Sequence, residues 1–440
     1  MKKQMFLIFA LMISIFAIMA SCAQDPAPPA GGVAAPPATG AEAPAAQPGD
    51  ADATVEVIQL EFFQQKMEEG PQRGYARMIE RFHEEFPHIQ IDLNTVPNAG
   101  AVLMMRIATG DIPPIFSDYP TQLQFQEKID NGVPLRISGH AFLDRIDPGA
   151  IQLSLCNNGE LYALPFTYNF MGIFYNIDIF NQHGVEIPTT YQDFIATLQT
   201  FQDAGVIPIG LTFRQPGRVG HMFQIMNAAW SGDTTRFVRV AESTGTIAGD
   251  PQLHRVAERM LEVLSFANED AFAIEDTGMW EGFANGQYAM TITGSFARGT
   301  ILIANPDVNF GVFPLPNDTL ADTTVLSGID AALAISAQAS PEEQEAALHF
   351  LEFITRTENA QIFSDYDGAP STVTAVAFAD PRLQPKIDKI QEGPVIDWLL
   401  GSLPSAIVSG MNHTVQEFLI HQDIDQFLVD LEFTIIAYAP

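Results

Sequence analysis

The chain of 440 residues carries 53 Asp and Glu against 21 Lys and Arg, a formal net charge of −32, and 47% of its residues are hydrophobic. Such an acidic chain is a poor partner for nucleic acid and for anionic lipid headgroups, because their phosphates repel it. Its length and hydrophobic content are sufficient for two domains, each with its own core.

The first 22 residues form a predicted targeting segment, with Lys2 and Lys3 at its start and an apolar run that ends at Met19. That run is too short for a stable membrane span. The tetrapeptide Met19-Ala20-Ser21-Cys22 resembles the bacterial lipobox, in which the Cys is acylated after cleavage, although Met replaces the usual Leu. We therefore expect a lipid on Cys22. The alternative is an ordinary secretory signal with an incidental Cys.

A tether is predicted for residues 23–53, which are dominated by Ala, Pro and Gly and have almost no side chains large enough to form a core. Removal of the targeting segment leaves 19 basic and 53 acidic residues, a net charge of −34. The one cysteine besides Cys22 is Cys156. We therefore expect no intramolecular disulfide, and we expect Cys156 to be a buried, unreactive thiol.

Past the tether, strands and helices alternate. Thr54 to Phe62 alternates and is rich in β-branched residues, which predicts a strand. The segment GYARMIERFHEEF, residues 74–86, has apolar side chains at helical spacing, and Pro87 ends the pattern before a second strand at residues 89–96. This order favours an α/β fold with mostly parallel sheets flanked by helices.

Three helix starts are marked by capping patterns further along the chain. Thr190 precedes Asp193 by three residues, Asp250 is followed by a proline, and Ser340 begins the sequence Ser-Pro-Glu-Glu. Residues 414–438 are predicted to form one or two further helices. The α/β class therefore extends over the whole folded part.

Four segments show a common resemblance. The longest, residues 164–194, reads LPFTYNFMGIFYNIDIFNQHGVEIPTTYQDF, with Tyr191 where a Trp is usual. The others are RIATGDIPPIF at 106–116, with Pro114 where an Asp is common, FANGQYAMTITGSF at 283–296 and SGIDAALAIS at 327–336. In order and spacing these segments resemble the family 1 extracellular solute-binding proteins, the group that includes maltose-binding protein.

The resemblance implies a two-lobe periplasmic-binding-protein fold of type II, with three crossovers near Pro165, Pro314 and Gly368. The first lobe would combine residues 54–164 and 315–367, and the second lobe residues 165–314 and 368–440. It implies a monomeric, lipid-anchored protein on the outer face of the cytoplasmic membrane, which binds a small solute in its cleft by hinge closure and delivers it to the permease subunits of an ABC importer.

A sugar is the expected solute, because its hydroxyls need polar partners and its C–H faces stack on aromatic rings. Phe63 and both Trp residues could instead complete a core, Asp118 could cap a helix, and Tyr366 could be part of the hinge. Most of the expected ligand-binding residues lie after predicted strands or near crossovers. Trp230 and Trp280 are included because each stands beside a polar residue, Ser231 or Glu281, which suits a stacking surface. The full set is Glu61, Phe63, Asp118, Tyr168, Asn169, Trp230, Trp280, Ser295, Phe296, Asp330 and Tyr366. Trp398 is a second-tier candidate.

Other functions stay open at this point. A secreted carbohydrate-active enzyme could draw an acid/base pair from so many carboxylates, but the sequence has no Gly-x-Ser-x-Gly, Gly-x-x-x-x-Gly-Lys or His-Glu-x-x-His motif. A sensor or adhesin could keep the same fold. Polyamines and short peptides are alternative ligands. We expect no metal and no cofactor, because the nine His residues are scattered.

Overall fold

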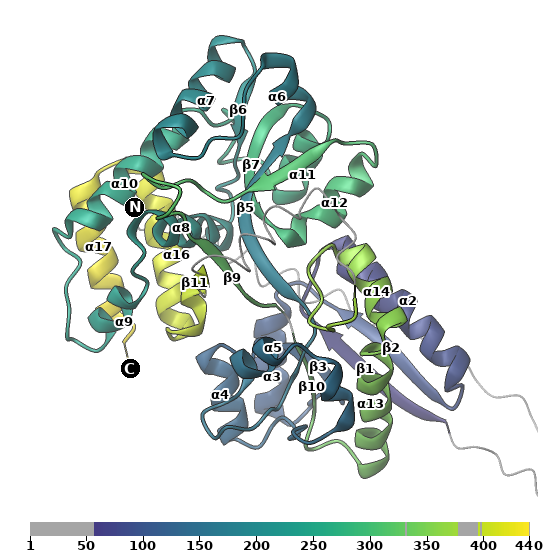
Figure 1. Ribbon diagram of the computed structural model, residues 1–440. Coiled ribbons are helices and arrows are strands. Elements are labelled where there is room, and N and C mark those ends of the chain that lie inside the picture. The colour runs from purple at the N-terminus through teal and green to yellow at the C-terminus, as the bar shows by residue number, and fades with distance from the viewer. Residues whose placement is uncertain (1–56, 331, 377–394, 397, 440) are drawn as a thin grey trace, which may run out of the picture. The chain divides into compact units, whose positions relative to one another are not determined.

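Two β-sheets organise the part of the chain that the structure describes. The computed structural model describes residues 57–330, 332–376, 395–396 and 398–439, all of which belong to one structural unit, Val55–Pro440. The expected targeting segment with Cys22 and the expected tether lie outside the described residues. Helices flank both sheets (Figure 1), and we call the parts built around them the first lobe and the second lobe. The two-lobe α/β class is confirmed.

The first sheet has the strand order β2-β1-β3-β10-β4. Strand β1 is parallel to β2 and β3, whereas β10 is antiparallel to both β3 and β4. Its strands are β1 (Ile58–Gln64), β2 (Ile89–Thr95), β3 (Ile115–Asp118), β4 (Leu164–Pro165) and β10 (Ala332–Ile335).

Helices cover both faces of the first sheet because side chains alternate along its strands. Phe62 packs edge-on against Tyr75 of one helix layer, with ring centroids 4.9 Å apart, while Phe63 belongs to a cluster with Leu103 and Phe116 on the opposite face. The helices of this lobe are α2 (Glu69–Glu85), α3 (Ala99–Thr109), α4 (Leu123–Asp130), η1 (Ala141–Arg145), α5 (Pro148–Ser154), α13 (Pro341–Ile354) and α14 (Thr357–Asp367).

The second sheet has the order β11-β9-β5-β7-β6, and β8 also pairs with β5. We expected mostly parallel sheets, but this sheet is mixed, because β5 runs antiparallel to β7, β8 and β9. Its strands are β5 (Tyr168–Asn176), β6 (Ile207–Gly210), β7 (Tyr288–Gly294), β8 (Phe310–Phe313), β9 (Val325–Ile329) and β11 (Val395–Ile396).

The helices of the second lobe enclose its largest hydrophobic cluster, which includes Trp230. Two of the predicted starts are confirmed here, because Thr190 accepts a hydrogen bond from the backbone N–H of Asp193 and Asp250 caps its own helix. The helices are α6 (Ile177–His183), α7 (Tyr191–Asp203), α8 (Pro216–Ser231), α9 (Thr235–Ala241), α10 (Pro251–Leu264), α11 (Asp276–Ala284), η2 (Ser295–Ala297), α12 (Arg298–Ala304), η3 (Leu399–Gly401), α16 (Ser405–His421) and α17 (Ile424–Ala437).

The order of the described strands in the two sheets requires three passages of the chain between them. The first lies between β4 and β5, close to the expected Pro165. The second lies between β9 and β10 rather than near Pro314, because β9 pairs with β5 and so keeps the chain in the second sheet as far as Ile329. The third follows Val373, which bridges Ile146 of the first lobe, and is therefore later than the expected Gly368.

Two glycines bring helices of the two lobes together. Gly70 of α2 and Gly299 of α12 are so close that a Cβ added to Gly299 would lie 3.0 Å from the Cα of Gly70. A Cβ on Gly70 would lie 2.6 Å from the carbonyl oxygen of Tyr366. Only residues without side chains fit this contact. Among the described residues, none of the helices has the length and apolar composition needed to cross a bilayer.

Candidate functional site

A cavity of about 870 Å³ lies between the two lobes. Both lobes and the second crossover contribute to it, and its wall contains aromatic rings, amides and charged groups. From the first lobe the lining residues are Gln65, Lys66, Met67, Glu68, Glu69, Pro97, Asn98, Tyr119, Thr121 and Gln122. The others are Asn169, Gln215, Gly217, Arg218, His221, Glu275, Asp276, Thr277, Trp280, Phe296, Thr300, Ile329, Asp330, Trp398 and Gly401.

A buried polar network joins the cavity to the crossovers. Lys66, two residues after the end of β1, forms an ion pair with Asp330 at the second crossover, and its Nζ lies 3.6 Å from Oδ1 of Asp367. Asn169, just after the first crossover, donates from Nδ2 to Oδ1 of Asp330 at 3.5 Å. Trp398 donates from Nε1 to Oδ1 of Asn169 at 2.7 Å. The network therefore ties the crossover segments to one cation.

Burial and charge act against each other in this network. Burial alone would lower the pKa of Lys66, but the carboxylates of Asp330 and Asp367 outweigh it and hold that pKa well above its usual value. Burial raises the pKa of Asp367 to about 6, although Lys66 opposes the shift. Lys66 is therefore a permanent cation, which holds two carboxylates close together where they would otherwise repel each other.

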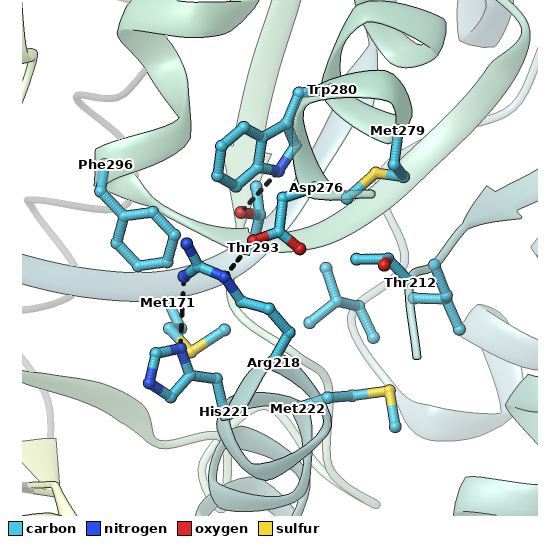
Figure 2. Close-up of a pocket in the computed structure, with 12 residues that line it drawn as sticks. Met171, Thr212, Arg218, His221, Met222, Asp276, Met279, Trp280, Thr293 and Phe296 are labelled. Atoms are coloured by element: carbon cyan, nitrogen blue, oxygen red, sulfur yellow. Dashed lines mark hydrogen bonds and ion pairs between the residues drawn. The ribbon is translucent and has the colours of Figure 1, made fainter. Parts of the chain in front are cut away.

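An aromatic wall lies on the second-lobe side of the cavity. The ring centroids of Trp280 and Phe296 are 6.1 Å apart, and those of His221 and Trp398 are 5.4 Å apart. Trp280 is held in place by a hydrogen bond of 3.2 Å from its Nε1 to Oγ1 of Thr293 (Figure 2). Flat rings beside hydrogen-bonding groups are the surface on which the apolar face of a sugar stacks.

Arg218 lies at the centre of this wall. Figure 2 shows its guanidinium between Asp276, His221 and Phe296. Its Nε pairs with Asp276, and its Cζ lies 5.0 Å from the ring centroid of Phe296 and 5.5 Å from that of Trp280. These distances are within the range of cation–π attraction. Behind it a small pocket of about 30 Å³ opens between apolar side chains, which include Met171, Met222 and Met279.

His221 is neutral in this setting. Burial, with a further contribution from the charge of Arg218, lowers the pKa of His221 to about 3. Its Nδ1 lies 3.5 Å from Nη1 of Arg218, a distance that suits a neutral ring accepting a hydrogen bond. Across the described residues, no three His, Cys, Asp or Glu side chains gather as they would to ligate a metal.

Five helices begin at the cavity, and their N-cap residues are among its lining. These residues are Glu68, Asn98, Gln122, Gln215 and Glu275. None of these five residues forms a side-chain hydrogen bond that caps its helix. By contrast, the N-cap residues of α7, α10 and α13 do form such a bond, and they do not line the cavity. The first backbone N–H groups of a helix have no partner within the helix. The cavity wall thus includes peptide donors as well as side chains.

The structure brings together four of the expected site residues, Asn169, Trp280, Phe296 and Asp330, all of which line the cavity. Trp398 lines it too. The remaining seven are not among the lining residues, so their role in ligand binding stays a prediction. Their positions follow from their contacts with the two lobes.

Three of these seven belong to the first sheet. Glu61 forms a two-pronged ion pair with Arg106, with both N–O distances at 2.7 Å. Phe63 is a core residue with 1% of its surface exposed. Asp118 is buried and lies 2.8 Å from Nζ of Lys128. Each therefore has a partner inside the first lobe.

Of the other four residues, three lie in or near the lobe interiors and one lies at the surface. Trp230 is buried in the core of the second lobe and donates to the carbonyl oxygen of Pro316 at 3.0 Å. Ser295 is fully buried, Tyr168 packs partly buried against the core of the first lobe, and Tyr366 is 40% exposed on α14. The presence of polar neighbours in the sequence therefore did not distinguish a Trp in the core from a Trp in the cavity wall.

Sequence reasoning included Asp330 but missed four other charged residues of the site, Lys66, Glu68, Arg218 and Asp276. One signal was present for Lys66, because it follows the first strand in a chain with only 21 basic residues. The signal for Arg218 was weaker, because a helix of mixed composition surrounds it. The partners of both residues lie far away in the sequence and leave no local pattern.

Comparison with known proteins identifies the family. Residues 77–389 match the family described as bacterial extracellular solute-binding protein, and this range is more than half of the chain. The chain belongs to this family. The resemblance seen in the sequence is thereby confirmed. For a solute-binding protein of this kind, the cavity between the lobes is the natural place to look for ligand contacts.

Relatives of this solute-binding protein include two with named sugars or sugar classes. The multiple sugar-binding protein of Streptococcus mutans is 25% identical over 331 residues, which are 72% of this chain and 76% of the relative. The melibiose/raffinose/stachyose-binding protein MelE of Bacillus subtilis is 21% identical over 373 residues, which are 80% of this chain and 84% of the relative. These relatives are binding proteins rather than enzymes.

Solved structures share the fold. The solute-binding protein RafE in complex with raffinose has a TM-score of 0.79 and 23% identity, covering 87% of this chain and all of that chain. A sugar transporter protein from Bacillus licheniformis in complex with stachyose has a TM-score of 0.72 and 18% identity, covering 86% of this chain and 98% of that chain. At these identities the likeness concerns the fold alone.

Proposed function

We propose that this protein captures an oligosaccharide in the cavity between its lobes and delivers it to the permease subunits of an ABC importer. The observation that carries the proposal is the composition of the cavity wall, in which Trp280, Phe296 and Trp398 lie beside Asn169 and Asp330. Aromatic faces and fixed hydrogen-bonding groups are complementary to the two kinds of surface that a sugar presents.

The size of the cavity supports an oligosaccharide over a single sugar ring. At about 870 Å³ it lies near the upper end of the range for small-molecule sites, roughly 300 to 1,000 Å³. Raffinose and stachyose are the first candidates, because MelE is named for both sugars and the RafE structure contains raffinose. Binding without catalysis is part of the proposal, since the relatives are binding proteins.

The same proposal includes a lipid on Cys22 and a monomeric protein held at the outer face of the cytoplasmic membrane. Support comes from the lipobox-like tetrapeptide and the tether that follows it in the sequence. Metabolic labelling with a clickable fatty acid tests this part. The wild-type chain is expected to take up the label and to sediment with membranes, and the Cys22→Ser variant is expected to do neither.

Thermal unfolding of the mature chain tests the binding function directly. A sugar at a hundred times its dissociation constant adds about 2.7 kcal/mol to the free energy of unfolding, which is an easily measured shift. The panel contains raffinose, stachyose, melibiose, monosaccharides, polyamines and short peptides. Chromatography of the recovered sugar shows whether it stays intact. Hydrolysis of the sugar, or a shift caused only by a peptide or polyamine, would refute the proposal.

A further inference from the structure

An ion pair crosses the cavity from one lobe to the other. Glu68 is the N-cap residue of α2 in the first lobe, and Arg218 lies in the first turn of α8 in the second lobe. Oε1 of Glu68 lies 3.4 Å from Nη2 of Arg218, and both side chains line the cavity. Because they come from different lobes, the distance between them depends on how far the cavity is open.

Arg218 does not need Glu68 to hold its position. Asp276, also in the second lobe, pairs with its Nε, and the rings of Trp280 and Phe296 lie within 5.5 Å of its Cζ. Burial would lower the pKa of Arg218, but Asp276 and Glu68 outweigh it and raise that pKa. The guanidinium is therefore a fixed cation on the second-lobe wall, whatever the position of the first lobe.

The segment that carries Glu68 is anchored to the first lobe. The backbone N–H of Gln65 donates to Oγ of Ser117 at 2.8 Å, and the backbone N–H of Lys66 donates to Oε1 of Gln64 at 2.7 Å. Helix α2 begins directly after Glu68. The segment that carries this carboxylate is therefore anchored to the first sheet, and Glu68 moves with that sheet.

The surroundings of the pair strengthen it. The side chain of Glu68 is 16% exposed and that of Arg218 is 23% exposed. Ion pairs on an open surface contribute little, but exclusion of water and a fixed geometry increase their contribution. A contact of this kind exists only when the lobes are close together, so it favours the closed arrangement over an open one.

We propose that Glu68 is a positioning residue of the binding site, which increases affinity for the sugar by pairing with the fixed Arg218 across the cavity and so favouring lobe closure. This inference rests on the proposed function. In this proposal the Glu68 carboxylate affects binding through the separation of the lobes and not through a contact with the sugar. Loss of the carboxylate would then change the lobe separation even when no sugar is present.

The neighbouring residue Glu69 provides a matched control. It lines the same cavity and is the first residue of α2, but its ion-pair partner Arg73 lies one turn further along the same helix. Glu69→Gln removes the same charge from the same segment and leaves the pair between the lobes intact. Both variants are made in the mature chain with Cys22→Ser and Cys156→Ser, which removes both native thiols.

Spin labels measure lobe separation without a ligand. Glu84 on α2 and Gln192 on α7 are exposed, and each is replaced by Cys for labelling. Glu68→Gln is expected to shift the unliganded distance distribution toward longer distances, and Glu69→Gln is expected to leave it unchanged. Added salt at 0.5 M is expected to lengthen the distances in wild type but not in Glu68→Gln, because it screens the pair. Identical distributions in all three proteins would overturn the proposal.

Binding kinetics with raffinose provide the second measurement. Glu68→Gln is expected to increase the dissociation rate about fivefold, the lower end of typical coupling between sites, while the association rate stays within twofold. An unchanged dissociation rate in Glu68→Gln would overturn the proposal, as would faster dissociation with an unchanged distance distribution. Failure of raffinose to bind wild type would count against the proposed function instead, and the distance measurement would then decide the role of Glu68.

Discussion

The indole Nε1 of Trp398 donates a hydrogen bond of 2.7 Å to Oδ1 of Asn169. Trp398 immediately precedes η3, near the last helices of the chain, while Asn169 follows the first crossover. Both residues line the cavity, and Asn169 is linked in turn to Asp330. The bond therefore connects a late segment of the second lobe to the crossover segments, at the point where the ligand is expected.

Trp398→Phe is expected to weaken sugar binding and also to destabilise the protein. The variant keeps an aromatic ring but leaves Oδ1 of Asn169 without this donor, at a cost of about 1 to 3 kcal/mol for a buried polar group. Calorimetric titration with raffinose and urea unfolding measure the two effects. Trp230→Phe is the matched control, because Trp230 also donates through Nε1 but lies outside the cavity lining. The control is expected to lose stability and keep affinity, and a loss of affinity in both would contradict this prediction.

Trp280→Ala and Asp118→Ala are expected to separate binding from stability. Trp280 presents its ring to the cavity, so its removal is expected to weaken raffinose binding about tenfold or more, in line with the roughly 1 to 3 kcal/mol lost with one aromatic stacking contact. Asp118 pairs with Lys128 inside the first lobe, and its removal leaves a buried cation unpaired, at a cost of about 3 kcal/mol or more. Denaturant midpoints and dissociation constants of both variants check this. Full affinity in Trp280→Ala would remove that ring from the site.

His221 is expected to make the protein less stable in acid. Its pKa is lowered to about 3 in the folded protein, while the unfolded chain has the ordinary value near 6.5. Below pH 6.5 the unfolded chain therefore binds a proton that the folded protein does not, so stability is full above pH 6.5 and falls with pH. The loss amounts to about 2 kcal/mol at pH 5. Urea unfolding at pH 7.5 and pH 5 is expected to show a smaller loss in His221→Gln, and equal losses would contradict the assignment.

Sugars that carry a carboxylate are expected to bind more weakly than their neutral parents. Among the described lining residues the two permanent cations are Lys66 and Arg218, and both are already paired with carboxylates. An anionic ligand would lose its hydration without gaining an unpaired cation, so a penalty of about tenfold or more is expected. Calorimetry with raffinose and with raffinose oxidised at a primary hydroxyl measures this difference. Equal affinities would show that one of the two pairs opens for the ligand.

Local patterns in the sequence were sufficient to predict the elements of the fold. The predicted capping box at Ser340 is present, with Glu343 closing it, because both partners lie within one turn of chain. The apolar stripe of α2 is buried as its spacing predicts, including Met78 and Phe82. The end of β1 lies two residues beyond the predicted Phe62, since a strand end depends on its neighbours in the sheet.

The site was only partly predictable, because its decisive contacts join residues far apart in the sequence. Asp330 was expected in the site, but nothing near it indicated its ion-pair partner Lys66, which lies 264 positions earlier. Trp230 was expected in the cleft, but it lies in the core. The second half of α8 is buried on nearly all sides, so its sequence lacks the alternation of apolar and polar residues that marks a core face and an exposed face. Composition alone does not show which face of such a helix meets a cavity.

The contact between Gly70 and Gly299 determines how the lobes can move against each other. With no side chain on either residue, the two helix backbones approach each other directly, and neither glycine obstructs a rotation of one helix against the other at this point. The pair can therefore serve as a pivot, while the ion pair between Glu68 and Arg218 on the cavity side favours the closed angle. An alanine at either position would act as a wedge, so a variant with every ligand contact intact could still fail to close.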